Sequence, residues 1–96
     1  MHVRLSDDAK ADVRAIFDFI AAENPDAAMR VADGLIMTAI HLESFPLLGK
    51  KGRVEGTREL AAPASPYILV YALIDEYHIT VERILHGVRA WPPLDE

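Results

Sequence analysis

The chain has 96 residues, a formal net charge of −5 and no cysteine, and 51% of its residues are hydrophobic. This length and composition predict one domain, residues 1–96, with a single small core. The lack of cysteine excludes disulfide bonds and thiolate metal sites. No apolar run approaches the roughly 18–20 residues that cross a membrane, and the first six residues contain no apolar signal segment. We therefore expect a cytoplasmic protein that makes no membrane contact.

The basic residues are concentrated in one segment of this acidic chain. Residues 46–60 contain four basic and two acidic residues, whereas residues 1–45 contain four basic and eight acidic residues. Because phosphate binding relies on clustered Lys and Arg, a net charge of −5 argues against direct sequence-specific DNA binding by this chain. The basic segment is then either a solvated loop or part of a surface that contacts a target.

The N-terminal third predicts a short strand followed by a helix. Residues 2–5 form the expected strand, and Ser6 is a favourable N-cap with two aspartates after it in the first helical turn. The helix is expected to end at about Glu23. Its apolar face consists of residues at helical spacing: Val13, Ile16, Phe17 and Ile20.

A second helix is predicted from Pro25 to about Ser44, with Asn24 as its cap and proline at its first position. The short connection implies an antiparallel helical hairpin. Gly34 either permits a close helix–helix approach or breaks the helix. The helix is more apolar than one sheet face requires, so its surplus is either buried core or a groove for a partner helix. The residues that widen its apolar face are Met29, Ile36, Met37 and Ile40.

Three strands are expected after a glycine-containing loop, at residues 57–62, 67–74 and 78–86. The middle one is an almost continuous apolar run and is expected at the centre of the sheet, covered on both faces. Asp75 and Glu76 form the turn before the last strand, whose alternation is imperfect. The expected fold is α+β, with the N-terminal strand at an edge and the helical hairpin packed on a three- to four-stranded antiparallel sheet.

Little catalytic chemistry is indicated. The four histidines, at positions 2, 41, 78 and 86, lack metal-ligand spacing, so we expect neither a metal nor a cofactor. His86, Arg89 and Trp91 remain at the end of the last strand, with Arg58 on a neighbouring strand. Arginine and histidine together can stabilise a phosphate and move a proton. Alternatively, Trp91 closes the core, and Arg58 pairs with a carboxylate such as Glu82 or Glu55.

Several segments resemble the RelE/ParE superfamily, the toxins of bacterial type II toxin–antitoxin pairs. Glu23 to Ala28 is similar to its helix–helix junction, and Phe45-Pro46 followed by Gly49 is similar to its exit from the second helix. The strand motifs that also match are Arg58-Glu59-Leu60, Tyr67 to Tyr71 and Leu85-His86-Gly87-Val88-Arg89. The order and spacing of these pieces carry the resemblance, and the superfamily has the fold predicted above.

The resemblance implies one of two activities, cleavage of mRNA on the ribosome or inhibition of DNA gyrase by binding. Ribonuclease members carry an arginine just after the first tyrosine of the central strand, where this chain has Ile68. They often have a tyrosine or a histidine–tyrosine pair near the C-terminus, and neither occurs in Trp91-Pro92-Pro93-Leu94 of this chain. These departures favour the ParE branch, a toxin that binds gyrase and is not an enzyme. The alternatives are a RelE-type ribonuclease, with Arg89 and His86 as weak catalytic candidates, and a non-toxic binding module.

The expected partner is a ParD-like antitoxin, and any repressor function would belong to the complex. Antitoxin contacts are expected at Met29, Ile36, Met37 and Ile40. Target contacts are expected at Lys50, Lys51, Arg53, Arg58, His86, Arg89 and Trp91.

Overall fold

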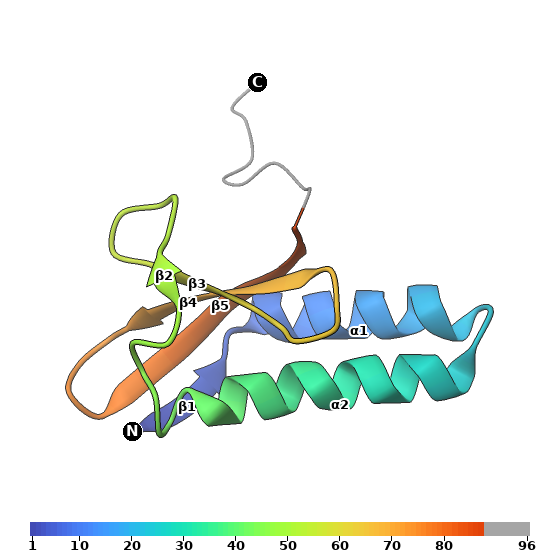
Figure 1. The fold of residues 1–96 in the computed structure, drawn as a ribbon, viewed down its shortest axis with the longest axis horizontal. Helices are drawn as coiled ribbons and strands as arrows, with labels where there is room; N and C mark the ends of the chain where they lie inside the picture. The colour runs from blue at the N-terminus through green and yellow to red at the C-terminus, as the bar shows by residue number, and fades with distance from the viewer. Residues whose placement is uncertain (88–96) are drawn as a thin grey trace.

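A computed structural model describes residues 1–87 and shows two helices lying side by side on one face of a β-sheet (Figure 1). The elements in chain order are β1 (His2–Leu5), α1 (Asp7–Ala21), α2 (Pro25–His41), β2 (Lys50–Lys51), β3 (Arg58–Ala61), β4 (Tyr67–Leu73) and β5 (His78–His86). The predicted α+β class with its helical hairpin is confirmed. Within residues 1–87, no helix is long and apolar enough to cross a membrane.

The sheet has five strands in the order β1-β5-β4-β3-β2, with β4 at the centre as predicted. It is mixed and not purely antiparallel, because β1 pairs with β5 in parallel while the other neighbours are antiparallel. A parallel pair needs a long crossover, which the helical hairpin provides. Between β1 and β5 the chain forms the helical hairpin and then strands β2, β3 and β4. The last strand, β5, lies next to β1 in the sheet. The fifth strand is β2, which lies in the segment predicted to be a loop.

Local capping starts both helices where the sequence predicts. The Ser6 hydroxyl accepts a hydrogen bond from the Ala9 N–H at 3.0 Å, and the Asn24 side chain accepts one from the Ala27 N–H at 3.0 Å. Helix α2 ends at His41 and not at about Ser44. The Ser44 N–H bonds to the His41 carbonyl, three residues back, at 3.2 Å, so the last turn tightens. Pro46 then cannot continue a helix.

Gly34 neither breaks α2 nor allows a close approach, because α2 is continuous through it and a Cβ added there has no atom within 4 Å. Replacing Gly34 by alanine is expected to raise the free energy of unfolding by about 1 kcal/mol, since glycine costs that much in a helix interior. Urea denaturation measures the change. Gly49→Ala is the control and should destabilise, because its Cβ would lie 2.8 Å from the Tyr71 ring and the Glu59 carbonyl oxygen. A stability loss in Gly34→Ala would contradict the expectation.

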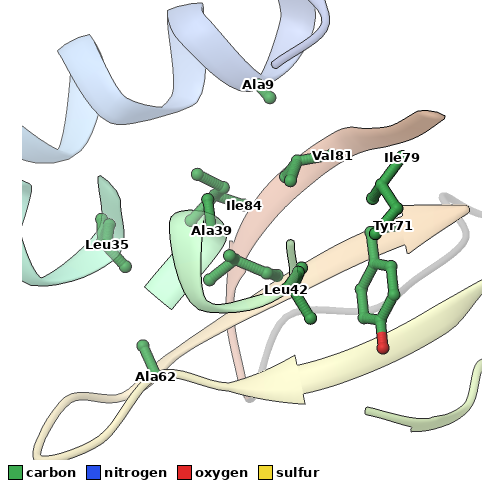
Figure 2. Packing of buried hydrophobic residues seen from close by; sticks show 10 residues of the cluster. Ala9, Leu35, Ala39, Leu42, Ala62, Tyr71, Ile79, Val81 and Ile84 are labelled. Atoms are coloured by element: carbon green, nitrogen blue, oxygen red, sulfur yellow. The ribbon is translucent and has the colours of Figure 1, made fainter. Parts of the chain in front are cut away.

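The core lies between the helices and the sheet. Figure 2 shows Leu35, Ala39 and Leu42 of the α2 region beside Ile79, Val81 and Ile84 of β5. The imperfect alternation of β5 comes from a bulge. Val70 lies opposite Arg83 whereas Tyr71 lies opposite Val81, so Glu82 has no partner on β4. Because one residue is left over, Val81 and Ile84 both reach the core although three positions separate them.

Beyond the end of β1, helix α1 closes the free edge of β5. The Ser6 N–H bonds to the Val81 carbonyl at 2.9 Å. The Asp12 carboxylate accepts the Ile84 N–H at 2.9 Å and the Arg83 Nε–H at 2.8 Å. Where the ladder between β1 and β5 ends, the Ile84 N–H of β5 is therefore satisfied by a side chain.

Candidate functional site

The outer face of α2 carries the surplus apolar side chains. Met29 is 54% exposed, Ile36 38%, Met37 57% and Ile40 46%. Spacings of seven, eight and eleven residues from Met29 place these side chains along one side of the helix. Leu35 and Ala39 point into the core from the other side. The four residues, called here the apolar face of α2, are thus not core residues of this chain.

The basic segment is ordered by the short ladder between β2 and β3. Lys50 lies opposite Glu59, and Lys51 lies opposite Arg58. Side chains of directly paired residues share a sheet face, so the first pair joins opposite charges on one face. The second pair places two cations together on the other face.

Arg53 is held by Glu59, whose side chain is only 3% exposed. The Glu59 carboxylate accepts the Arg53 backbone N–H at 2.8 Å, its Nη2–H at 3.1 Å and its Nε–H at 3.2 Å. These hydrogen bonds from Arg53, mainly from its side chain, lower the pKa of the Glu59 carboxyl below its ordinary value. The charge of Arg53 is therefore largely neutralised inside the molecule, and the pair fixes the loop after β2.

Glu59→Gln is expected to lower the free energy of unfolding at pH 7 by about 2 kcal/mol, because charge-assisted hydrogen bonds are lost at a buried carboxylate. A depressed folded-state pKa stabilises the fold above the unfolded pKa of about 4.3, and this stabilisation disappears as pH falls through the folded value. The difference between variant and wild type should therefore shrink below about pH 4.

Urea denaturation at a series of pH values measures this difference. Glu55→Gln is the control, because Glu55 is exposed and makes no ion pair within residues 1–87. A difference that stays constant down to pH 2 would show that the Glu59 charge contributes nothing.

Tyr71 of the central strand β4 forms hydrogen bonds with the backbone at the start of the basic segment. It is fully buried, and its hydroxyl accepts the Gly49 N–H at 2.9 Å and donates to the Pro46 carbonyl at 2.9 Å. In Figure 2 its hydroxyl points away from Ile79. Gly49 is required beside the ring, since any Cβ there would meet it at 2.8 Å. The central strand thus holds both ends of the chain segment that leads into β2.

A cleft of about 470 Å³ lies next to Lys51 and Arg58, and Leu47 and Leu73 also line it. We call these four residues the cationic cleft. Leu47 is 64% and Leu73 38% exposed. The Arg58 Nε atom is buried without a hydrogen-bond partner, and Arg58 makes no ion pair with Glu55 or Glu82. The alternative that Arg58 pairs with one of these carboxylates is therefore wrong.

Nothing in the sequence marks Leu47, Leu73 or Glu59 as part of this site. Leu47 and Leu73 are 26 positions apart and look like ordinary core candidates, and Glu59 looks like a surface carboxylate. The fold brings Leu47 and Leu73 to one cleft, and strand pairing places Glu59 on β3 between Lys50 of β2 and Val70 of β4.

His86 lies away from the cationic cleft. Strand β4 separates β5 from β3, so the expectation that Arg58 is on a strand next to the last one is wrong. Along β4, His86 lies opposite Tyr67 and Arg58 opposite Tyr71. Four residues at about 3.4 Å each put roughly 14 Å between them along the strand. Arg89 and Trp91, the other C-terminal candidates, lie outside the described residues.

No group of three or more histidine, aspartate or glutamate side chains in residues 1–87 could hold a metal ion. His78 instead contacts Asp75 in the turn before β5, with Nδ1 2.9 Å from the carboxylate. The hydrogen bond from the Tyr77 N–H is the main cause that lowers the pKa of the Asp75 carboxyl, and the hydrogen bond with the His78 side chain is the second cause. Asp75 therefore has a structural role in the turn, as predicted for a hairpin tip.

The model of a family described as "ParE toxin of type II toxin-antitoxin system, parDE" matches residues 3–91. The chain belongs to the ParE toxin family. This ParE-family toxin is also 32% identical over 74 residues to a protein of Sinorhizobium fredii named "Putative toxin Y4kP", covering 77% of the chain and 75% of that protein. The predicted resemblance to toxins of type II toxin–antitoxin systems is confirmed.

Two solved structures have the same fold as this ParE-family toxin. A chain of the chromosomal ParDE toxin–antitoxin system from P. aeruginosa superposes with a TM-score of 0.78 at 22% identity, covering 88% of this chain and 92% of that one. A chain of the RelBE2 toxin–antitoxin complex from Mycobacterium tuberculosis superposes with a TM-score of 0.63 at 27% identity, covering 88% and 94%. The arrangement of two helices on a mixed sheet is thus shared with toxin–antitoxin proteins.

Proposed function

We propose that this toxin acts by binding DNA gyrase and that a ParD-like antitoxin holds it inactive in the cytoplasm. The observation that carries the proposal is the combination of an exposed apolar face on α2 with a basic segment that is only partly available for contact. Both features suit protein–protein docking, and the family match points to ParE.

The placement of the polar side chains supports binding over RNA cleavage. Ile68, at the position where ribonuclease members carry an arginine, lies on β4 opposite Leu85 and Ala61. Arg53 is neutralised by Glu59, and His86 is two strands from Arg58. A general acid or base must lie within hydrogen-bond reach of the proton it transfers. Among residues 1–87, no histidine or tyrosine lines the cationic cleft, and Glu55 is the one carboxylate that does.

The apolar face of α2 supports an amphipathic helix as the antitoxin segment. Helices that dock in this way use apolar residues at spacings of three, four and seven, and Met29, Ile36, Met37 and Ile40 present that pattern outward. Two methionines in this face add side chains that adapt to a partner surface. The two structural relatives come from toxin–antitoxin systems, which supports an antitoxin partner for this chain.

The test is a DNA supercoiling assay with purified gyrase. Micromolar toxin is expected to inhibit supercoiling, and an equimolar amount of the antitoxin encoded beside it should restore activity. Gyrase that stays fully active at that concentration would refute the gyrase proposal, and specific cleavage of mRNA on translating ribosomes would replace it with a RelE-type activity. Expression without the antitoxin separates an active toxin, which arrests growth, from a non-toxic binding module.

A further inference from the structure

The cationic cleft places two like charges opposite each other in the sheet. Lys51 and Arg58 are directly paired across β2 and β3, and neither makes an ion pair within residues 1–87. Like charges at directly opposite positions destabilise a sheet. The other pair of the same ladder, Lys50 and Glu59, carries opposite charges. An anion between Lys51 and Arg58 would remove the repulsion.

Arg58 also carries a donor that nothing in the described part of the chain satisfies. Its Nε atom is buried and has no hydrogen-bond partner. Leaving a buried donor unsatisfied costs about 1–3 kcal/mol, so such atoms are rare and call for an acceptor. Glu55 also lines the cleft but forms no ion pair with either cation. Within residues 1–87 no group satisfies this donor, and neither cation is compensated by a carboxylate.

We propose that the cationic cleft binds an acidic segment of the toxin's protein target. One carboxylate of the segment lies between Lys51 and Arg58, and an adjacent apolar side chain packs against Leu47 and Leu73. The inference rests on the proposed function in one respect, that the toxin acts by docking on a protein. It shares no residue with the apolar face of α2, so contacts with antitoxin and target can be separated by mutation.

The walls and charges of the cleft favour a protein segment over a nucleic acid. Leu47 and Leu73 are exposed apolar side chains, which a sugar–phosphate backbone would leave unused. Binding of a polyanion relies on many cations, whereas here Arg53 is already neutralised and the whole chain carries −5. A carboxylate followed by an apolar residue complements this cleft, because the carboxylate can contact Lys51 and Arg58 while the apolar side chain packs on Leu47 and Leu73.

The test is fluorescence anisotropy with a fluorescein-labelled peptide of four Glu-Leu repeats and the full-length toxin. Arg58→Gln is expected to weaken binding roughly 10- to 100-fold, because a charge-assisted contact at a buried group is lost. Lys51→Gln should weaken binding by about 5- to 10-fold, because its side chain is exposed. Lys10→Gln is the matched control, since it removes the same charge from an exposed position on α1 and should change nothing.

Four outcomes would overturn the inference. The Glu-Leu peptide fails to bind, a Gln-Leu peptide binds as tightly as the Glu-Leu peptide, Lys10→Gln weakens binding as much as Arg58→Gln, or a labelled thymidine octanucleotide binds more tightly than the peptide. Circular dichroism checks the fold of each variant. If Arg58→Gln does not fold, Lys51→Gln carries the test, because an exposed lysine is not required for stability.

The supercoiling assay separates this inference from the proposed function. If Arg58→Gln inhibits gyrase as strongly as wild type, the cleft is not the target site although the toxin still acts on gyrase. If wild type leaves gyrase active but binds the peptide through Arg58 and Lys51, the acidic-segment site stands and the gyrase proposal fails.

Discussion

Met37→Asp is expected to weaken binding of the antitoxin by about 100-fold, because it puts a charge into an interface that otherwise gains about 2–3 kcal/mol from burying the methionine. Met37 is 57% exposed in the free toxin, so the change should not disturb its core. Isothermal titration calorimetry with the co-encoded antitoxin measures the dissociation constant. Thermal unfolding of the free variant should match that of wild type.

Phe19→Asp is the matched control for this prediction. Phe19 is 80% exposed on α1, so the same charge replaces an exposed apolar side chain on the other helix. We expect its antitoxin affinity to stay within about 3-fold of wild type, since surface substitutions outside an interface have small effects. Unchanged affinity in Met37→Asp, or an equal loss in both variants, would rule out the apolar face of α2 as the specific antitoxin site.

Tyr71→Phe is expected to lower the free energy of unfolding by about 2–3 kcal/mol. The substitution removes one hydroxyl and leaves the Gly49 N–H and the Pro46 carbonyl without their partner inside the protein. Each such unsatisfied buried group costs about 1–3 kcal/mol, and partial access of water to Pro46 lowers the sum. Urea denaturation monitored by circular dichroism measures the loss.

Tyr77→Phe serves as the comparison for Tyr71→Phe. Tyr77 is 62% exposed, and its hydroxyl makes no hydrogen bond within residues 1–87, so we expect a change within about 0.5 kcal/mol. If Tyr71→Phe changed the free energy of unfolding as little as Tyr77→Phe, the hydrogen bonds of Tyr71 to Gly49 and Pro46 would not stabilise the chain before β2. A loss in Tyr71→Phe should also loosen the cationic cleft, which would appear as weaker binding of the Glu-Leu peptide.

Local signals explain why much of the fold could be predicted. Ser6 and Asn24 each accept a hydrogen bond from a backbone N–H three residues later, which depends only on their own short segment. The continuous apolar run of β4 predicts a buried strand inside the sheet, and β4 has a strand on each side with Leu69 to Ala72 buried. The parallel pairing of β1 was not predicted, because it depends on how the whole helical hairpin returns the chain to the sheet.

The candidate site was predicted only as a list of residue types. The exposed side of α2 could be recognised, since Met29, Ile36, Met37 and Ile40 exceed what one helix buries against one sheet. The basic segment could also be found from the sequence. Which of its cations are paired inside the protein and which are not could not be found. Arg53 and Arg58 are similar in sequence context, yet one is paired with a buried carboxylate and the other is left with an unsatisfied donor.

By itself the amino-acid sequence determined the helices, the central strand, the surplus apolar face of α2 and the likeness to ParE toxins, because each depends on neighbouring residues or on motif order. Only the tertiary structure decided which cations remain available. The register between β2 and β3 sets Lys50 against Glu59 and Lys51 against Arg58, and a shift by one residue would reverse the faces. Such pairing depends on contacts between segments, which no local preference specifies.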